Sequence, residues 1–429
     1  MERFDVIVVG AGPAGATTAY LLAKAGVNVV LIERGQTAGS KNVSGGLLYT
    51  PQLDAVIPAF WDSAPLERAI TSHQVVMLSE SASVALDVRA LDSARPPSDA
   101  FSVLRARFDP WLAQQADEAG AALITGVTVD ALKMESGRVV GIRSGEDEIL
   151  ADVVVVAEGT RALLLQRAGL QGQFEPRDVS LGIKVIIDLP ESVIEERFQC
   201  SAGTGAAYTF VGQTRGIEGG GFLYTNRDTL SLGVVVKIDS LYKSKLQPHQ
   251  VLEVFLAHPL VARLCEGGEV VEYSAQTVHR GGYGLASTLY GDGYVVVGSA
   301  ARLLLNNIAT LRGMDFAVVS GAQAAGAILR AREAGAYLSD NLASYGTTLT
   351  ETAIYREWET FKRLYSVLEN DRLYSVYPDL VSRTMATMFY PSLEARSKLL
   401  ASLRREMKGR VSMLTLVKDL YQLSRGAVL

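Results

Sequence analysis

The apolar positions of the first 33 residues predict a strand, a helix and a second strand in close succession. Residues 5–9 form a short, mostly β-branched run, which is typical of a buried parallel strand. Residues 14–24 are rich in alanine and leucine, which favour a helix, and Gly26 is suited to end it. A second apolar run over residues 27–32 ends at the acidic Glu33. This order predicts a βαβ unit.

Three glycines lie in the turn between this strand and helix, at the spacing G-x-G-x-x-G. Gly10 permits the tight turn, Gly12 lets a pyrophosphate approach the backbone, and Gly15 lets the helix pack closely on the strand. Glu33 is placed to accept hydrogen bonds from a ribose diol. Because strand, turn, helix and acid fall in register, the sequence predicts a dinucleotide site rather than a glycine-rich turn that binds nothing.

Beyond this unit the chain separates into strand-rich and helix-rich segments. Residues 101–121 predict a strand that enters a helix, and residues 180–237 are rich in predicted strands. Residues 249–264 and the small residues over 314–333 predict further helices, and the pattern is helical from about residue 339 onward. The nucleotide-binding domain is therefore expected to consist of separated segments, with a second sheet domain inserted between them.

The amino-acid composition limits which kinds of binding site the chain can form. A hydrophobic content of 48% fits a large core, and a net charge of −5 gives no indication of nucleic-acid binding. Cys200 and Cys265 are the two cysteines, too few for an ordinary iron–sulfur cluster or an all-cysteine zinc site, and we expect them to be inert thiols. No apolar run approaches the roughly 18 residues of a membrane span. The N-terminus leaves no room for a signal peptide, so we expect a cytoplasmic protein.

Several longer motifs invite comparison with known families: Arg105 within VLRARFDPWL, the strand end Ala157–Glu158–Gly159, and GSAA at 298–301. They resemble the two-domain FAD-dependent flavoproteins that include aromatic hydroxylases and geranylgeranyl reductases. Within that group, GSKNVSGGLLY, GGGFLYTNRDTLSLG, VVEYSA and LRGMDFAVVSG are similar to the electron-transfer-flavoprotein:quinone oxidoreductases, especially their short Fix-type members. The resemblance covers the chain from Phe4 to about residue 380.

The resemblance implies an α/β, two-domain FAD-binding fold. A Rossmann domain like that of glutathione reductase and the hydroxylases would be discontinuous, with an inserted β-rich domain and a helical C-terminus. The FAD-binding domain would comprise residues 1–75, 101–180 and 270–338. The β-rich quinone or substrate domain would comprise residues 76–100 and 181–269, and the helical C-terminal region residues 339–429.

The resemblance also implies a function. One FAD would take electrons from the α and β subunits of an electron-transfer flavoprotein and pass them to quinone. The long members carry an iron–sulfur domain, which two cysteines cannot supply. In Fix-type complexes a small ferredoxin-like iron–sulfur subunit provides the cluster and the complex bifurcates electrons, so that partner and role are implied here. No catalytic side chain and no metal ligand is expected, because the flavin performs the redox chemistry.

The same resemblance assigns site residues. The glycine turn would hold the FAD pyrophosphate, Glu33 the adenosine ribose, Val129 the adenine through its backbone, and Arg105 the phosphates or ribityl chain. The quinone headgroup would meet Gly219 and Gly220, with Phe222 and Tyr224 beside them. The full set of predicted FAD-binding residues is Gly10, Gly12, Pro13, Ala14, Gly15, Glu33, Arg34, Lys41, Asn42, Gly45, Gly46, Arg105, Val129, Ala157, Glu158, Gly159, Gly298, Ser299, Gly313 and Met314.

Two of these positions have a specific meaning. Many flavoproteins have an aspartate where this chain has Ser299, and a hydroxyl still makes a hydrogen bond worth about 1 kcal/mol, so we expect an altered flavin contact. Gly313 would begin a helix whose positive end points at the flavin and favours its anionic reduced form. A glycine that begins a helix with no ligand is the simpler interpretation of Gly313.

Structural roles remain open for other candidates. Arg105 could form an ordinary salt bridge, and Glu158 could cap a helix. Tyr224, Tyr273 and Tyr283 could stack on a quinone, but strand tyrosines more often pack in sheets. His279 and Arg280 could donate to a reduced flavin or quinone oxygen, but a lone histidine is more often structural.

The C-terminal segment is basic and amphipathic. From Lys398 onward it carries seven basic side chains against two acidic ones, among regularly spaced leucine, methionine and valine. Such a helix suits an anionic membrane surface, which would place the protein on the cytoplasmic face of a membrane, or a partner subunit. Both occupants stay open.

Three other functions are compatible with the same motifs. A geranylgeranyl or other prenyl-lipid reductase would have the same architecture, although the aromatic–proline substrate motif of those reductases is not evident. An NAD(P)H-dependent aromatic hydroxylase would likewise show a single nucleotide fingerprint. A non-catalytic subunit that keeps the fold without using it is left open by Ser299.

Overall fold

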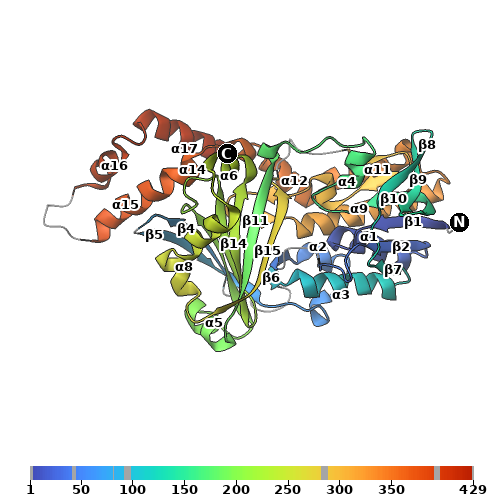
Figure 1. The fold of residues 1–429 in the computed structure, drawn as a ribbon, viewed down its shortest axis with the longest axis horizontal. Helices are drawn as coiled ribbons and strands as arrows, with labels where there is room; N and C mark the ends of the chain where they lie inside the picture. Colours follow the sequence, from blue (N-terminus) through green and yellow to red (C-terminus); the bar gives the residue numbers. More distant parts are fainter. Residues whose placement is uncertain are drawn as a thin grey trace.

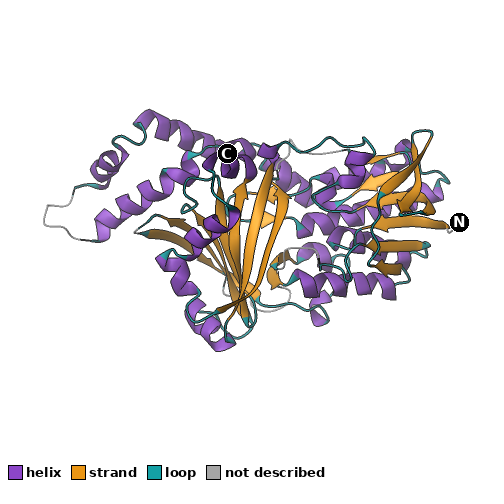
Figure 2. Cartoon of the chain, viewed as in Figure 1, coloured by secondary structure: helices purple, strands orange, loops and turns teal. Residues whose placement is uncertain are grey.

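The computed structural model describes residues 3–40, 45–80, 82–90, 98–281, 288–390 and 397–427. Three candidates from the sequence, Lys41, Asn42 and Tyr283, lie outside the described residues. Strands gather in two large sheets, and helices cover them on the outside and continue beyond the second sheet (Figure 2).

The first sheet contains both strands of the predicted βαβ unit, β1 and β2, as neighbours. Its strand order is β16-β17-β10-β1-β2-β7, with β9 and β8 paired beyond β10, and β1 runs parallel to both β2 and β10. The side chains of β2 and of Val6 to Val9 in β1 are buried, which explains their continuous apolar sequence. The strands are β1 (Arg3–Val9), β2 (Val29–Glu33), β7 (Ala122–Thr125), β8 (Ala131–Glu135), β9 (Arg138–Ser144), β10 (Asp147–Val156), β16 (Tyr290–Gly291) and β17 (Tyr294–Val296).

Helices α1 and α9 pack closely together on this sheet. A Cβ atom at Gly321 would lie 2.5 Å from the carbonyl oxygen of Ala14, and the Thr18 hydroxyl donates to the Gly321 carbonyl at 3.2 Å. Small residues therefore bring the two backbones together. The helices around the first sheet are α1 (Pro13–Lys24), α2 (Pro51–Asp54), α3 (Arg105–Glu118), α4 (Leu163–Arg167), α9 (Met314–Glu333), α10 (Ser339–Leu342) and α11 (Ser344–Thr350), with short 3-10 turns at Phe60–Asp62 and Gly298–Ala301.

The second sheet has the order β15-β11-β14-β13-β12-β4-β6-β3, with β5 beside β4. Alternate residues such as Ile183, Val185 and Val234 face helices α5, α7 and α8 and form a separate core with them. Its strands are β3 (Gly46–Tyr49), β4 (Ala69–Leu78), β5 (Ser83–Arg89), β6 (Ala100–Val103), β11 (Val179–Asp188), β12 (Thr204–Val211), β13 (Gly219–Thr225), β14 (Thr229–Lys237) and β15 (Glu269–His279). Its helices are α5 (Glu191–Phe198), α6 (Ile238–Ser244), α7 (Pro248–Leu256) and α8 (Pro259–Leu264), and a 3-10 turn, Pro176–Asp178, precedes β11.

The remaining helices extend the molecule away from the N-terminus, and α14 to α17 lie at the opposite end from β1 (Figure 1). Arg372 on α14 forms a bidentate ion pair with Asp419 on α17, which ties the last helix to the others. Within the described part of the chain, no helix combines the length and apolar character needed to cross a bilayer. The elements are α12 (Ala353–Thr360), α13 (Leu364–Val367), α14 (Arg372–Ser375), α15 (Tyr377–Phe389), α16 (Leu399–Met407) and α17 (Met413–Ala427), and a small hairpin is formed by β18 (Leu305–Asn306) and β19 (Leu311–Arg312).

The sequence predictions differ from the structure in a few places. The helix predicted over 249–264 is two helices, because Pro259 cannot donate to the preceding turn and His258 begins a new helix by accepting from the Leu260 amide at 3.3 Å. Strand β15 pairs with β11 in the second sheet, whereas the predicted division groups it with the FAD-binding segments. The domain boundaries themselves stay a prediction.

Candidate functional site

The predicted nucleotide turn has the geometry of an anion cradle. Gly10 has φ of +105°, and a Cβ atom there would lie 2.5 Å from the Ala157 carbonyl oxygen. Helix α1 begins after Gly12 without a side-chain cap, so the backbone amides of its first turn remain available to a phosphate. The Glu33 carboxylate accepts from the amides of Ala11 at 3.0 Å and Gly35 at 2.7 Å. These residues fit the pyrophosphate and ribose of a dinucleotide.

A cavity of about 480 Å³ extends from this turn to the second sheet. Most predicted FAD residues line it, whereas Gly15 and Gly298 lie behind its wall. A Cβ at Gly15 would overlap the Gly10 carbonyl, and one at Gly298 would lie 2.9 Å from the Ala14 Cβ, so both glycines serve packing. The predicted residues that line the cavity are Gly10, Gly12, Pro13, Ala14, Glu33, Arg34, Gly45, Gly46, Arg105, Val129, Ala157, Glu158, Gly159, Ser299, Gly313 and Met314.

Arg105 forms the salt bridge considered for it and also lines the first cavity. Its guanidinium donates to the Asp109 carboxylate through Nε at 2.6 Å and Nη2 at 2.5 Å. Burial lowers the pKa of Arg105, but the charge and the hydrogen bonding of Asp109 together raise it overall. The same guanidinium lies 3.7 Å from where a Cβ on Gly12 would be. The salt bridge therefore holds a permanent cation over the glycine turn.

Glu158 caps a helix and also lines the first cavity. Its carboxylate accepts from the amide of Leu164 at 2.9 Å, at the start of α4, as expected for a cap. Burial raises the pKa of Glu158, and these backbone donors oppose that shift. The side chain lines the cavity as well, so helix capping places a carboxyl group beside the nucleotide turn.

Helix α9 begins after Gly313, as predicted, and its N-terminus borders the first cavity. Gly313 begins this 20-residue helix without a side-chain cap, and Gly313, Met314 and Ala317 line the cavity. Asp315 in the first turn is paired with Arg312 at 2.6 Å. Ser299 lies in the turn that follows β17 and also lines the cavity. The positive end of a long helix therefore faces this part of the cavity.

Lys184 was not among the residues predicted from the sequence, yet it lines the first cavity. This lysine sits in the centre of β11 within the otherwise apolar run SLGIKVIID, and it lines the cavity with an exposed fraction of 1%. Burial lowers its pKa to about 7. A charged residue in the middle of a buried strand was the signal that could have identified it.

A second, more apolar cavity of about 250 Å³ adjoins the first. Gly219, Gly220, Phe222 and Tyr224, the predicted quinone residues, all line it. Burial raises the pKa of the Tyr224 hydroxyl, which therefore stays protonated. The residues that line both cavities are Phe222, Tyr224, Val235, Val278 and Leu311.

Helices far along the chain close this second cavity, a position that their helical sequence pattern did not indicate. Their contribution is apolar and aromatic, and it comes from α13, α14, α15, α17 and the turns between them. These residues are Tyr365, Leu368, Leu373, Tyr374, Tyr377, Pro378 and Leu423.

A cluster of charged side chains forms one wall of the second cavity. Lys237 donates to the two carboxylate oxygens of Glu218 at 2.9 and 3.2 Å, and Arg280 lies 4.0 Å from the same carboxylate. Arg280 also lies 3.5 Å from Glu369, which is half exposed. Burial raises the pKa of Glu218, while Lys237 opposes the shift. The cluster connects an apolar cavity with the surface.

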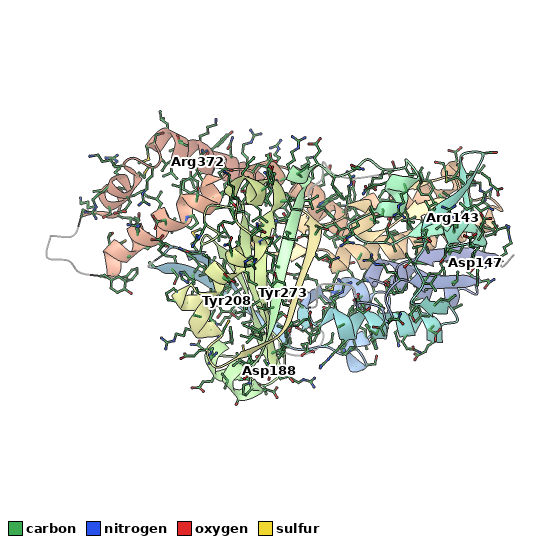
Figure 3. The ribbon with its side chains drawn as sticks, viewed as in Figure 1. Arg143, Asp147, Asp188, Tyr208, Tyr273 and Arg372 are labelled. Atoms are coloured by element: carbon green, nitrogen blue, oxygen red, sulfur yellow. The ribbon has the colours of Figure 1, made fainter. Side chains whose placement is uncertain are left out.

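His279 lines the second cavity and is fully buried. Its Nδ1 accepts from the Gly281 amide at 3.2 Å, which places the imidazole proton on Nε2, and Nε2 has no partner among the described residues. Burial lowers its pKa to about 4, so the ring is neutral at pH 7. Tyr273, in contrast, is 55% exposed on the edge strand β15 and lines neither cavity (Figure 3).

Both cysteines are half-buried free thiols. Burial raises the pKa of Cys200, and it raises that of Cys265 to about 11. Raised pKa values make thiolates scarce at neutral pH, in agreement with the expectation of inert side chains.

Three families match successive parts of this chain. Residues 5–90 match the FAD dependent oxidoreductases, and residues 180–278 match the ubiquinone-binding domain of electron-transfer-flavoprotein:quinone oxidoreductase (ETF-QO). Residues 364–427 match the C-terminal domain of the ETF-QO/FixC family. The second and third matches include most of the strands and helices that line the second cavity.

Whole-length relatives agree with these matches. The chain is 42% identical over 419 residues to Protein FixC of Escherichia coli strain K12, with 97% of each chain covered. It is 38% identical over 423 residues to the probable electron transfer flavoprotein-quinone oxidoreductase YdiS of the same organism, again with 97% of each covered. A solved geranylgeranyl bacteriochlorophyll reductase-like protein of Thermoplasma acidophilum shares the fold, with a TM-score of 0.73, 22% identity and coverage of 99% of this chain and 100% of that one.

These findings confirm the predicted fold class, the resemblance and the FAD cofactor. The likeness to the reductase concerns the fold alone. The nucleotide turn, the cavity that continues from it and the whole-length relatives lead to one conclusion. The chain belongs to the FixC and ETF-QO family and is an FAD-dependent oxidoreductase.

Proposed function

We propose that this protein passes electrons from an electron-transfer flavoprotein, through FAD in the first cavity, to a quinone in the second. The observation that carries the proposal is the wall of five side chains shared by the two cavities. A single layer of residues keeps two occupants within electron-transfer distance while separating them. The name of the relative YdiS, a probable electron transfer flavoprotein-quinone oxidoreductase, and the ubiquinone-binding match support the same direction of electron transfer.

Different residues of the two cavities would bind FAD and quinone. FAD, when bound, supplies the redox chemistry. The turn at Gly10 and Gly12, with Arg105 and Glu33, would hold its nucleotide half, and α9 would direct its positive end at the flavin half. Gly219 and Gly220 line the second cavity and would present the backbone of β13 to a quinone ring, and the aromatic helical wall would exclude water from it.

Filling the second cavity tests this proposal. Leu373 lines the second cavity and not the first, so Leu373→Trp should block quinone without affecting FAD. We expect the reoxidation of reduced FAD by a short-chain quinone to slow at least tenfold, while reduction by the partner flavoprotein keeps its rate. The control is Leu86→Trp, at a side chain 65% exposed on β5. Equal reoxidation rates in the two variants would show that quinone does not bind in this cavity.

We also propose that the protein works as the quinone-reducing subunit of a bifurcating Fix-type complex, with a small ferredoxin-like iron–sulfur subunit as partner. The two cysteines of the chain support the need for a cluster from another subunit, because four thiolates are required. Copurification of this chain with its candidate partners tests it. A complex that contains the flavoprotein subunits and reduces quinone but binds no iron would contradict this part.

The apolar surface of α15 to α17 supports a peripheral position on the cytoplasmic face of a membrane. Phe389, Leu414 and Val417 are 75%, 84% and 56% exposed, and the basic residues Arg410 and Lys418 lie close to Leu414 and Val417 along the chain. Leu423 of the same α17 lines the second cavity, which would give a lipid quinone a short way in. In a flotation assay with anionic vesicles, we expect the Leu86→Glu protein to float with the vesicles and the Leu414→Glu protein to stay behind. Equal flotation of both would favour a partner subunit on this surface.

A further inference from the structure

Lys184 is a buried cation in a position that ordinary sheet packing does not explain. It lies opposite Gly233 of β14 and Ser274 of β15, so its two neighbours across the sheet are small. Its immediate neighbours along β11, Ile183 and Val185, face the apolar core on the other side of the sheet. The ammonium group is therefore directed to the side of the sheet that closes the first cavity, with 1% of the residue exposed.

The charge of Lys184 is poorly compensated by the protein. Its Nζ donates to the Gly45 carbonyl at 3.2 Å. Among the described residues, Lys184 forms no ion pair within 4 Å, unlike Arg105 and Lys237. Glu272 attracts the ammonium from a greater distance and Arg105 repels it, while burial lowers its pKa to about 7. A desolvated cation without a close anion is costly, so a structural role alone would favour an apolar residue here.

The position of Lys184 within the cavity is defined by two consecutive glycines. A Cβ at Gly45 would lie 3.1 Å from the Lys184 Nζ, and a Cβ at Gly46 would lie 3.3 Å from the Met314 Cε at the start of α9. Lys184 and the N-terminus of α9 therefore border the same part of the cavity, beside Gly45 and Gly46. Both contribute positive potential there. With the nucleotide half of FAD at the turn, this part is left for its ring system.

We propose that Lys184 is the charge-compensating residue for the flavin ring of FAD, and that its ammonium stabilises the negative charge that the ring acquires on reduction. Two electrons from the reductant and one proton from solvent convert the oxidised ring to the reduced monoanion. Lys184 keeps its own proton and pairs with that charge. The role concerns the bound FAD and does not depend on which electron donor or acceptor the protein uses.

The reduction potential of the bound flavin tests this role directly. Titration of FAD-loaded protein with dithionite, followed by absorbance, needs no quinone and no partner protein, so its outcome is independent of the proposed function. Lys184→Gln keeps a hydrogen-bond donor for Gly45 but removes the charge, and Lys184→Arg keeps the charge. The control is Lys243→Gln, at a lysine whose side chain is 75% exposed.

We expect Lys184→Gln to bind reduced FAD at least tenfold more weakly relative to oxidised FAD, a decrease of about 30 mV or more for a two-electron couple. Lys184→Arg and Lys243→Gln should stay close to the unmodified protein. The absorption of reduced Lys184→Gln protein should also shift toward that of neutral reduced flavin at pH 7. An unchanged potential in Lys184→Gln protein would overturn the proposal. Loss of oxidised FAD from both Lys184 variants would overturn it too, because Lys184 would then simply support the Gly45 segment.

Discussion

The rings of Phe222 and Tyr224 stack with centroids 5.3 Å apart and planes inclined by 26°, and both side chains line both cavities. Two residues of one strand, separated by a single position, thus form much of the partition between the proposed flavin and quinone sites. They project from the same face of β13 because side chains alternate along a strand.

Replacing Phe222 should join the two cavities. We expect Phe222→Ala to lower the free energy of unfolding by about 3 kcal/mol, the low end for Phe→Ala because the ring is only half-buried. Urea denaturation measures this, and equilibrium binding of a quinone analogue should weaken as the stacked wall is lost. Phe389→Ala, at a side chain 75% exposed, is the control. Equal stability of both variants would mean that the partition does not depend on this ring.

Gly45 and Gly137 form a matched pair for testing the flavin end of the first cavity. Their φ angles are +82° and +84°, so alanine is equally strained at both, at a cost of about 1 kcal/mol. At Gly137 a Cβ meets nothing within 4 Å, whereas at Gly45 it collides with the Ser231 hydroxyl. Gly45→Ala should therefore destabilise the protein further and weaken FAD binding, as fluorescence titration of the apoprotein can measure. Equal FAD affinity in the two variants would place the flavin elsewhere.

His279 should make stability depend on acid pH. Burial lowers the pKa of His279 from 6.5 to about 4. The stability that the neutral ring contributes is therefore fully present above pH 6.5 and is lost as the pH falls from there through about 4. We expect a loss of about 2 kcal/mol between pH 7 and pH 4.5. His279→Gln should flatten this part of the stability profile in urea denaturation, and the exposed His249→Gln should not. A profile that keeps its full slope in His279→Gln protein would contradict this assignment.

Asp419 should hold the last helix against the second cavity. Its carboxylate accepts from Arg372 Nε at 2.6 Å and Nη2 at 2.9 Å, and the Tyr377 hydroxyl also donates to it. Figure 3 shows Arg372 among the C-terminal helices. These donors hold the pKa of Asp419 well below its usual range.

We expect Asp419→Asn to loosen α17, because the amide cannot accept the same bidentate pair. Limited proteolysis should then cleave the C-terminal segment several-fold faster, and binding of a quinone analogue should weaken because Leu423 of α17 lines the second cavity. Binding of FAD should be unchanged. A loss of FAD affinity equal to the loss of quinone affinity would indicate general unfolding rather than release of this helix.

The sequence by itself determined the nucleotide half of the first cavity. Gly10, Gly12 and Glu33 lie within one βαβ unit, and the spacing of such a local motif dictates its geometry. The helix over residues 314–333 was equally predictable, because its small residues follow one another along the chain. Longer motifs identified the family and its cofactor.

Only the tertiary structure decided where the two cavities meet. Lys184, Phe222 and Val278 come from three strands, and pairing in one sheet places them on the same face. Helices after residue 360 then close the second cavity, although nothing in their own pattern indicates it. Strand register and helix docking depend on contacts between segments far apart in the chain, so local sequence carries little information about them.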